Sequence, residues 1–160
     1  DIILYVKIFL GIKKKIKKTI LWSNYGPVIK NDKGYFSFYT PTLNNISSVE
    51  QWYRMNKANN FDQWIDAMEM MSIPMFNAGY GDKFGNIFYI YNASLPIRNE
   101  GYNWNQVLPG NTSETLWDEY LSFDKLPMVK NPKSGYIQNC NSSPFLTTKN
   151  NNGSKTIDQI

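Results

Sequence analysis

The sequence predicts an α+β fold made of antiparallel strands, one helical segment and a long loop region. Aromatic and β-branched residues fill 35–40 and 87–91, as is typical of strands. Apolar residues recur at three- and four-residue spacing over 48–71, as an amphipathic helix requires. Residues 95–144 are rich in proline, glycine and asparagine between short apolar islands, a composition typical of an ordered loop crossing a surface.

The first forty residues contain the strands expected at the N-terminal end. Residues 2–10 are apolar enough for one strand, and a second apolar run lies at 19–22. Gly26-Pro27 interrupts that run, which resumes briefly before a turn at 31–34. The aromatic strand at 35–40 follows, and Pro41 ends it.

The helical period over 48–71 is interrupted at 59–62, so we expect two helices that meet at a bend. Ser47 or Ser48 is the expected N-cap of the first helix and Asn60 that of the second, because short polar side chains accept hydrogen bonds from unpaired helical N–H groups.

A β-hairpin is expected after the helices. Residues 73–80 and 87–91 are its strands, and 82–86 has the Gly-Asn chemistry of its turn. Asp82 is expected to cap this turn.

Composition bounds the chemistry that this chain can supply. Its 160 residues suit one domain, and no apolar run reaches the ~18 residues that a membrane-spanning helix needs. A single cysteine, Cys140, excludes an internal disulfide, and we expect it to be a small packing residue. The lack of histidine excludes Ser-His-Asp and Cys-His triads and histidine metal sites within these residues.

The net charge of +4 comes from one end, because residues 1–40 hold eight lysines against two aspartates. The cluster at 13–18 could bind phosphates or an anionic membrane, and isoleucines at 12, 16 and 20 would suit a basic amphipathic helix. With two arginines and no nucleic-acid motif in the chain, we favour a solvated hairpin end between two strands, and we expect no nucleic-acid partner.

Several motifs in register identify a family resemblance. The chain resembles the penicillin acylase family of N-terminal-nucleophile hydrolases, in particular its acyl-homoserine-lactone and aculeacin-type branch. The motifs are YGPVI at 25–29, where tyrosine replaces the histidine of His-Gly-Pro-Val-Ile, EQWYRMNKA at 50–58, NFDQW at 60–64, DKFGNIFY at 82–89, LPIR at 95–98, GYNW at 101–104, LPG at 108–110 and NPKSGYIQNCNSSPF at 131–145.

The resemblance implies part of an αββα N-terminal-nucleophile hydrolase sandwich and hydrolysis of the amide bond of an N-acylated small molecule. In that family the first residue of the β chain is the nucleophile and its own α-amino group is the base. Asp1 cannot take the nucleophile's role, so the resemblance implies an internal piece of the β chain that is inert alone. By the same resemblance, Asn141 is the oxyanion donor; from the residues alone, the preferred role is to satisfy loop backbone groups.

The resemblance also places Trp52, Met75 and Phe76 near the wall of an apolar acyl pocket, although Trp52 is equally typical of a helix core. We assign no metal and no cofactor within the chain, since the family's calcium ligands lie mainly elsewhere. Arg98 is expected to pair with loop carbonyls or a carboxylate. The implied partners are the α chain and the remainder of the β chain, and the implied location is periplasmic or extracellular.

Residues 1–146 are expected to form the acylase-like piece and 147–160 a loose polar tail. Two other functions remain open on the residues alone. One is an aromatic-rich β module that binds a ligand such as carbohydrate without catalysis. The other is a basic membrane-surface or nucleic-acid module built on the lysine cluster.

Overall fold

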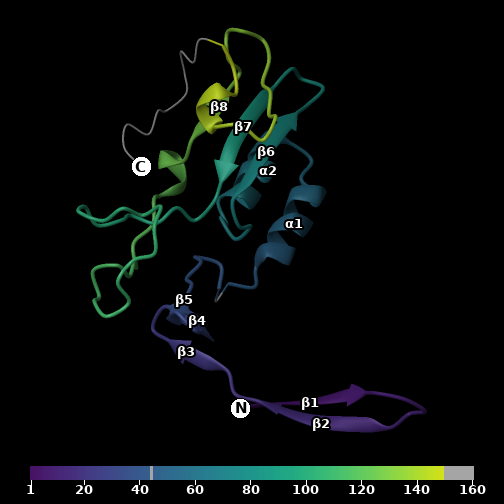
Figure 1. The fold of residues 1–160 in the computed structure, drawn as a ribbon. Coiled ribbons are helices and arrows are strands. Elements are labelled where there is room, and N and C mark those ends of the chain that lie inside the picture. The colour runs from purple at the N-terminus through teal and green to yellow at the C-terminus, as the bar shows by residue number, and fades with distance from the viewer. Residues whose placement is uncertain (44, 150–160) are drawn as a thin grey trace.

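The computed structural model describes residues 1–43 and 45–149, which form three small antiparallel sheets and two helices (Figure 1). This confirms the predicted α+β class with antiparallel strands. In chain order the elements are β1 (Ile2–Lys7), β2 (Lys13–Lys18), β3 (Leu21–Ser23), β4 (Gly26–Asn31), β5 (Gly34–Ser37), α1 (Ser48–Lys57), α2 (Phe61–Met68), β6 (Phe76–Gly81), β7 (Ile87–Asn92) and β8 (Met128–Lys130), with short 3-10 turns at Phe123–Lys125 and Pro144–Leu146.

The N-terminal hairpin, β1 with β2, extends away from the rest of the chain (Figure 1). The hairpin was expected, but the position of its lysines was wrong. They form strand β2 itself, paired from Lys13 opposite Lys7 to Lys18 opposite Ile2, and residues 8–12 make the turn. Lysines are tolerated in a strand when both of its faces reach water, and almost all of β2 is exposed.

The second sheet has the order β3-β4-β5, and the YGPVI motif begins its middle strand. Gly26 has a φ of +105°, and a Cβ there would lie 2.8 Å from the Leu43 side chain and 2.9 Å from the Phe38 carbonyl oxygen. The motif therefore requires glycine because the chain at 38–43 folds directly against it. The same fold ends β5 at Ser37, three residues earlier than expected.

Two helices meet at a bend, as the interrupted period predicts. Asn60 caps α2, accepting a hydrogen bond of 2.9 Å from the Gln63 backbone N–H. Ser47 stands at the N-cap of α1, but its side chain makes no capping hydrogen bond. The bend lets both helices cover one sheet, and Trp64 and Met68 of α2 enter its core.

The third sheet has the order β6-β7-β8, and the hairpin predicted for β6 and β7 is confirmed. Asp82 caps its turn, accepting hydrogen bonds from the Phe84 and Asn86 backbone N–H groups at 2.9 and 3.0 Å. The hydrogen bond from the Asn86 side chain is the main cause that lowers the Asp82 pKa. Strand β8 was not predicted, because its three residues are too few to show a period.

The core lies between the helices and this third sheet. Five buried side chains form it: Trp64, Met68, Phe88, Ile90 and Leu126. Met68, Ile90 and Leu126 are fully buried. The same sheet borders the two candidate regions described below. Strand β6 lines a cavity beside α1, and Ile87 of β7 anchors the loop that follows β8.

The end of the described chain is more ordered than the expected boundary suggests. Thr147 and Thr148 are buried, and the Thr148 hydroxyl donates to the Tyr136 carbonyl at 2.9 Å. These two residues therefore pack onto the preceding loop. Residues 150–160 of the expected loose tail lie outside the described residues.

Candidate active site

Trp52 and Phe76 face a cavity between α1 and β6, here called the α1–β6 cavity. Their rings meet edge to face with centroids 5.5 Å apart, and the cavity has a volume of about 230 Å³. Trp52 is 42% exposed, so it is not the core residue that its helical period would also allow. The remaining walls are mainly apolar and come from Met55, Trp64, Met68, Ile73, Ala78 and Gly79, with Asn77 and Asn92 as polar members.

Met75 stands apart from its two predicted companions. It has a φ of +38°, its side chain is 66% exposed, and it does not line the cavity. The left-handed backbone at Met75 turns the chain into β6 and directs the next residue, Phe76, to the cavity wall. The assignment of Met75 to a substrate pocket stays a prediction.

Gln51, beside Trp52 on α1, fixes this helix to the sheet. Its side chain is fully buried and donates to Asn92 Oδ1 at 2.9 Å. Its carbonyl oxygen accepts from the backbone N–H groups of Ser72 and Ile73 at 2.7 and 2.9 Å. Asn92 in turn donates to the Met68 carbonyl at 2.8 Å.

Every hydrogen-bonding group of the Gln51 amide except one N–H thus has a partner, and the network ties α1, α2 and β7 around the α1–β6 cavity. Sequence reasoning missed Gln51, because a glutamine in a helix is typical of a solvated face. The one available signal is its place inside the EQWYRMNKA motif.

Asn141 lies in the loop that joins β8 to the last described residues. It is exposed, its φ is +56°, and its backbone N–H donates to Asn139 Oδ1 at 3.2 Å. Asparagine tolerates this left-handed conformation better than most residues. Among the described residues, the Asn141 side-chain amide makes no hydrogen bond, so its NH₂ group is free to donate.

The Asn141 loop and the α1–β6 cavity share strand β6. Ile137 of the loop packs over Gly79, where a Cβ would lie 3.9 Å from Ile137 Cδ1, and Gly79 lines the cavity. Asn77, another lining residue, accepts a hydrogen bond of 2.5 Å from the Tyr89 hydroxyl. The structure thus brings the loop and the cavity to one sheet but to opposite faces, because Gly79 points to the loop while Ala78 packs on the helix side. Among the described residues, no hydrogen bond or ring contact joins Asn141 itself to Trp52 or Phe76.

The same loop is anchored at both ends. At its start, Asn131 Oδ1 accepts from the Ile87 N–H at 2.9 Å. At its end, the Gln138 N–H donates to the Thr147 carbonyl at 2.8 Å and the Thr147 hydroxyl to the Pro144 carbonyl at 2.8 Å. Cys140, expected to pack inside, is exposed, because the loop points residues 139–141 to the surface.

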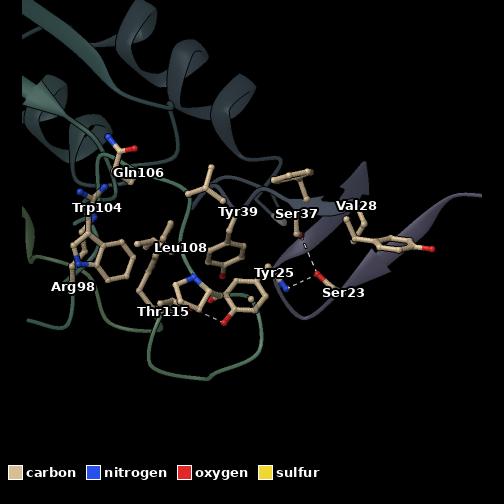
Figure 2. Close-up of a pocket in the computed structure, with 16 residues that line it drawn as sticks. Ser23, Tyr25, Val28, Ser37, Tyr39, Arg98, Trp104, Gln106, Leu108 and Thr115 are labelled. Atoms are coloured by element: carbon tan, nitrogen blue, oxygen red, sulfur yellow. Dashed lines mark hydrogen bonds between the residues drawn. The ribbon is translucent and has the colours of Figure 1, made fainter. Parts of the chain in front are cut away.

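A larger cavity, of about 540 Å³, lies between the second sheet and the loop at 98–117 (Figure 2). Figure 2 shows Val28 and Ser37 on the strand side and Trp104 and Leu108 on the loop side, with Tyr25 and Tyr39 between them. The Tyr25 hydroxyl bonds to the Thr112 carbonyl and to Thr115 Oγ1, the latter at 2.8 Å. Sequence reasoning did not find this cavity, because its walls are far apart in the chain.

Arg98 supports this aromatic cavity by stacking. Its guanidinium lies 5.4 Å from the Trp104 ring centroid and 6.0 Å from that of Trp117. The expected pairing with a carboxylate or loop carbonyls is wrong for the part of the chain that is described, because the two indole faces hold the cation instead. Behind Trp117, burial and then a hydrogen bond with Tyr39 raise the pKa of Tyr120 to about 12.

The described residues contain no group of three or more acidic, histidine or cysteine side chains that could hold a metal ion. Among these residues, no helix is both long and apolar enough to cross a membrane.

Three comparisons relate this chain to known proteins. The model of the family described as penicillin amidase matches residues 7–157. Penicillin G acylase of Escherichia coli is 29% identical over 130 residues, which are 79% of this chain and 15% of that protein. The acyl-homoserine lactone acylase PvdQ of Pseudomonas savastanoi pv. phaseolicola is 26% identical over 85% of this chain and 20% of its own length.

A solved structure of a penicillin G acylase is also similar to this chain. A thermostable penicillin G acylase from Alcaligenes faecalis superposes with a TM-score of 0.75 and 26% identity, over 96% of this chain and 27% of the other. This likeness confirms the predicted fold class, part of an N-terminal-nucleophile hydrolase fold. The chain spans 15% to 20% of the length of the two curated relatives. Because the family model covers most of its length, the chain belongs to the penicillin amidase family.

Proposed function

We propose that these residues are a segment of an amidohydrolase that cleaves the amide bond of an N-acylated small molecule. The segment supplies an oxyanion donor, Asn141, and part of the acyl pocket, whereas the nucleophile lies outside these 160 residues. The observation that supports this most is the Asn141 side-chain amide, which lies on an exposed loop packed against strand β6 through Ile137 and makes no hydrogen bond among the described residues.

Amide hydrolysis requires stabilisation of negative charge. When a nucleophilic oxygen attacks the carbonyl carbon, the carbonyl π electrons move to oxygen and form a tetrahedral oxyanion. The Asn141 NH₂ group can donate a hydrogen bond to that oxygen without itself changing protonation. The intermediate then collapses, the C–N bond breaks, and the amine leaves with the proton that the attacking hydroxyl gave up. Water attacks the resulting ester and releases the carboxylic acid.

The acyl group is proposed to occupy the α1–β6 cavity. Trp52 and Phe76 offer an edge-to-face aromatic wall, and most other lining groups are apolar. A cavity of about 230 Å³ suits a group of modest size, and the relatives include acylases of penicillin G and of acyl-homoserine lactones. A periplasmic or extracellular location, an α chain and the remainder of a β chain are proposed as the setting of the parent enzyme.

The decisive experiment replaces Asn141 in the full-length enzyme that contains this segment. Asn141→Ala should lower kcat by about 100-fold or more, which is ~3 kcal/mol of transition-state stabilisation, while KM stays near its original value. Asn141→Asp should lose at least as much, because a carboxylate cannot donate and repels the oxyanion. Asn105→Ala, in another exposed loop, is the matched control and should leave kcat unchanged. A near-normal kcat for Asn141→Ala would falsify the oxyanion role.

The pocket assignment has its own test. Trp52→Ala should raise KM for short acyl groups and improve the relative kcat/KM for bulkier ones, because it removes one wall of the cavity. Tyr53→Ala is the control on the neighbouring position, since Tyr53 is 62% exposed and does not line the cavity. Equal effects of the two variants on acyl preference would remove Trp52 from the proposed pocket.

A second candidate function rests on the larger cavity. Its wall combines Tyr25, Tyr35, Tyr39, Trp104 and Trp117, and aromatic faces of this kind bind apolar or sugar-ring surfaces. Under this alternative, the 160 residues bind a carbohydrate without catalysis, and salt changes the affinity little. Trp104→Ala should then abolish binding, whereas Trp22→Ala, an exposed tryptophan that does not line the cavity, should not.

A further inference from the structure

The N-terminal hairpin is the part of the described chain with the least cover. Its sheet has two strands only, which is marginal in water unless something packs on it. All six residues of β1 are exposed, among them Leu4 at 45%. In Figure 1 the hairpin stands clear of both other sheets and both helices.

The two faces of the hairpin differ in chemistry. Side chains alternate along a strand and directly paired residues share a face, so Ile2, Leu4 and Val6 lie on one face with Lys18, Ile16 and Lys14 opposite them. We call the four apolar residues of this face, Ile2, Leu4, Val6 and Ile16, the apolar face; the two lysines are exposed on the outer strand and can extend their amines into water. The opposite face carries Tyr5 and Ile3 among the lysines at 7, 13, 15 and 17. Ile16 is the only residue of β2 that is partly buried, because the apolar face already packs across the strands.

The two edges differ as well. Strand β2 has lysine at five of its six positions, and a lysine-rich strand is how proteins protect a sheet edge from further pairing. Strand β1 is apolar at five consecutive positions, Ile2 to Val6, and these positions carry none of the charges or prolines that protect an exposed edge. Its other edge has no strand beside it among the described residues.

We propose that the hairpin is a docking surface for a further strand and its supporting layer from the same parent polypeptide. This strand pairs with the free edge of β1, and the covering layer buries the apolar face, while β2 stays the outer edge and its lysines stay in water. The proposal rests on the proposed function, in which these residues are one segment of a longer acylase.

The lengths of the relatives favour an occupant from the parent polypeptide. The chain spans 15% of the length of the Escherichia coli relative and 27% of the superposed solved structure, so homologous polypeptide several times longer than this segment is available to cover the hairpin. Strand addition suits β1, because its backbone groups are unpaired on one side and its side chains are apolar. A second copy of the segment would place two hairpins edge to edge and is the main competing occupant.

Hydrogen exchange of the full-length protein tests the proposal by comparing the two strands. In an isolated hairpin, every second amide of each strand points outward and exchanges quickly. The proposal predicts slow exchange at all amides of β1, about 100-fold slower than at the outward amides of β2. Fast exchange at alternate amides of both strands, or full protection of β2 with half protection of β1, overturns it. Protection that disappears on dilution identifies a second copy instead and also overturns it.

A matched pair of variants tests the faces. Leu4→Lys and Tyr5→Lys make the same change at neighbouring positions on opposite faces of β1. Leu4→Lys should lower the yield of folded full-length protein severalfold, whereas Tyr5→Lys should leave it unchanged. Equal yields overturn the assignment of the apolar face, and the exchange comparison on the unmodified protein holds whether or not Leu4→Lys folds.

The outcome can be separated from that of the proposed function. A full-length protein that hydrolyses N-acyl substrates but shows alternate fast exchange in β1 disproves the docking surface alone. A full-length protein with complete β1 protection and no amide hydrolysis supports the docking surface and disproves the proposed activity.

Discussion

Two regions of the chain contain strands of aliphatic and aromatic residues but differ in burial. One is the helix-covered sheet, β6-β7-β8 with α1 and α2, and the other is the N-terminal hairpin. Ile90 and Leu126 of the first region are fully buried, whereas Ile3 and Leu4 of the second are about half exposed, at 50% and 45%. The difference lies in the packing: α2 packs on the sheet through Trp64 and Met68, whereas the two described helices both lie away from the hairpin (Figure 1). The alternation of residues along a strand therefore predicts which face is apolar, but burial of that face requires another segment that packs on it.

The largest expected effect lies in the covered region. Leu126→Ala should destabilise the chain by about 3 kcal/mol, because it removes buried methyl groups and leaves a cavity among Met68, Phe88 and Ile90. Urea unfolding followed by tryptophan fluorescence measures this change in the free energy of unfolding. A loss below ~1 kcal/mol would show that this core can collapse around the gap, and the contrast between the two regions would weaken.

The covered region is also where sequence reasoning succeeded. The β6–β7 hairpin, the Asn60 cap and the Asp82 turn depend on residues close together in the chain, and each was predicted. Strand β8 and the bridge between Pro96 and Tyr120 were not, since each depends on a partner dozens of residues away. Local periodicity carries no information about that partner.

The candidate site shows the same limit. The family resemblance led to Trp52, Met75, Phe76 and Asn141, and the structure brings Trp52 and Phe76, but not Met75, together at one cavity. Gln51 was missed because its role exists only once 72–73 and Asn92 have folded around it. The lysines of β2 were misplaced because a strand exposed on both faces shows no apolar alternation.

The next largest loss of stability is expected at Gln51, and it tests whether the packing of α1 on the sheet stabilises this region. Gln51→Leu should cost about 2 kcal/mol, because the N–H groups of Ser72 and Ile73 and the Asn92 side chain lose buried hydrogen bonds. The loss is measured as the free energy of unfolding. Asn56→Leu, an exposed polar residue on the same helix, is the control and should change it by less than about 0.5 kcal/mol. Equal losses would show that the network does not hold α1 on the sheet.

A smaller loss of stability is expected at Asn60, which caps α2, the second helix that packs on the sheet. Asn60→Ala should destabilise the chain by about 1 kcal/mol, because the Gln63 N–H loses its capping acceptor at the start of α2. Asn60→Asp should recover most of the loss, since its carboxylate accepts the same hydrogen bond and is favoured at a helix N-terminus. Thermal unfolding of the three proteins checks the order. No recovery by aspartate would mean that the Asn60 side chain acts through packing and not through the cap.

The smallest expected effect completes the comparison, because it repeats the leucine-to-alanine change in the uncovered region. Leu4→Ala should alter the free energy of unfolding of the 160 residues by less than about 0.5 kcal/mol, since Leu4 is 45% exposed and its removal opens no enclosed cavity. In the full-length protein the same change should cost about 2 kcal/mol or more, because the proposed covering layer makes Leu4 a core residue. Urea unfolding of both proteins measures the two losses. If the loss is the same small value in both, the hairpin is uncovered in the full-length enzyme too. The difference in burial between Leu4 and Leu126 then exists in the full-length enzyme as well as in the 160 residues.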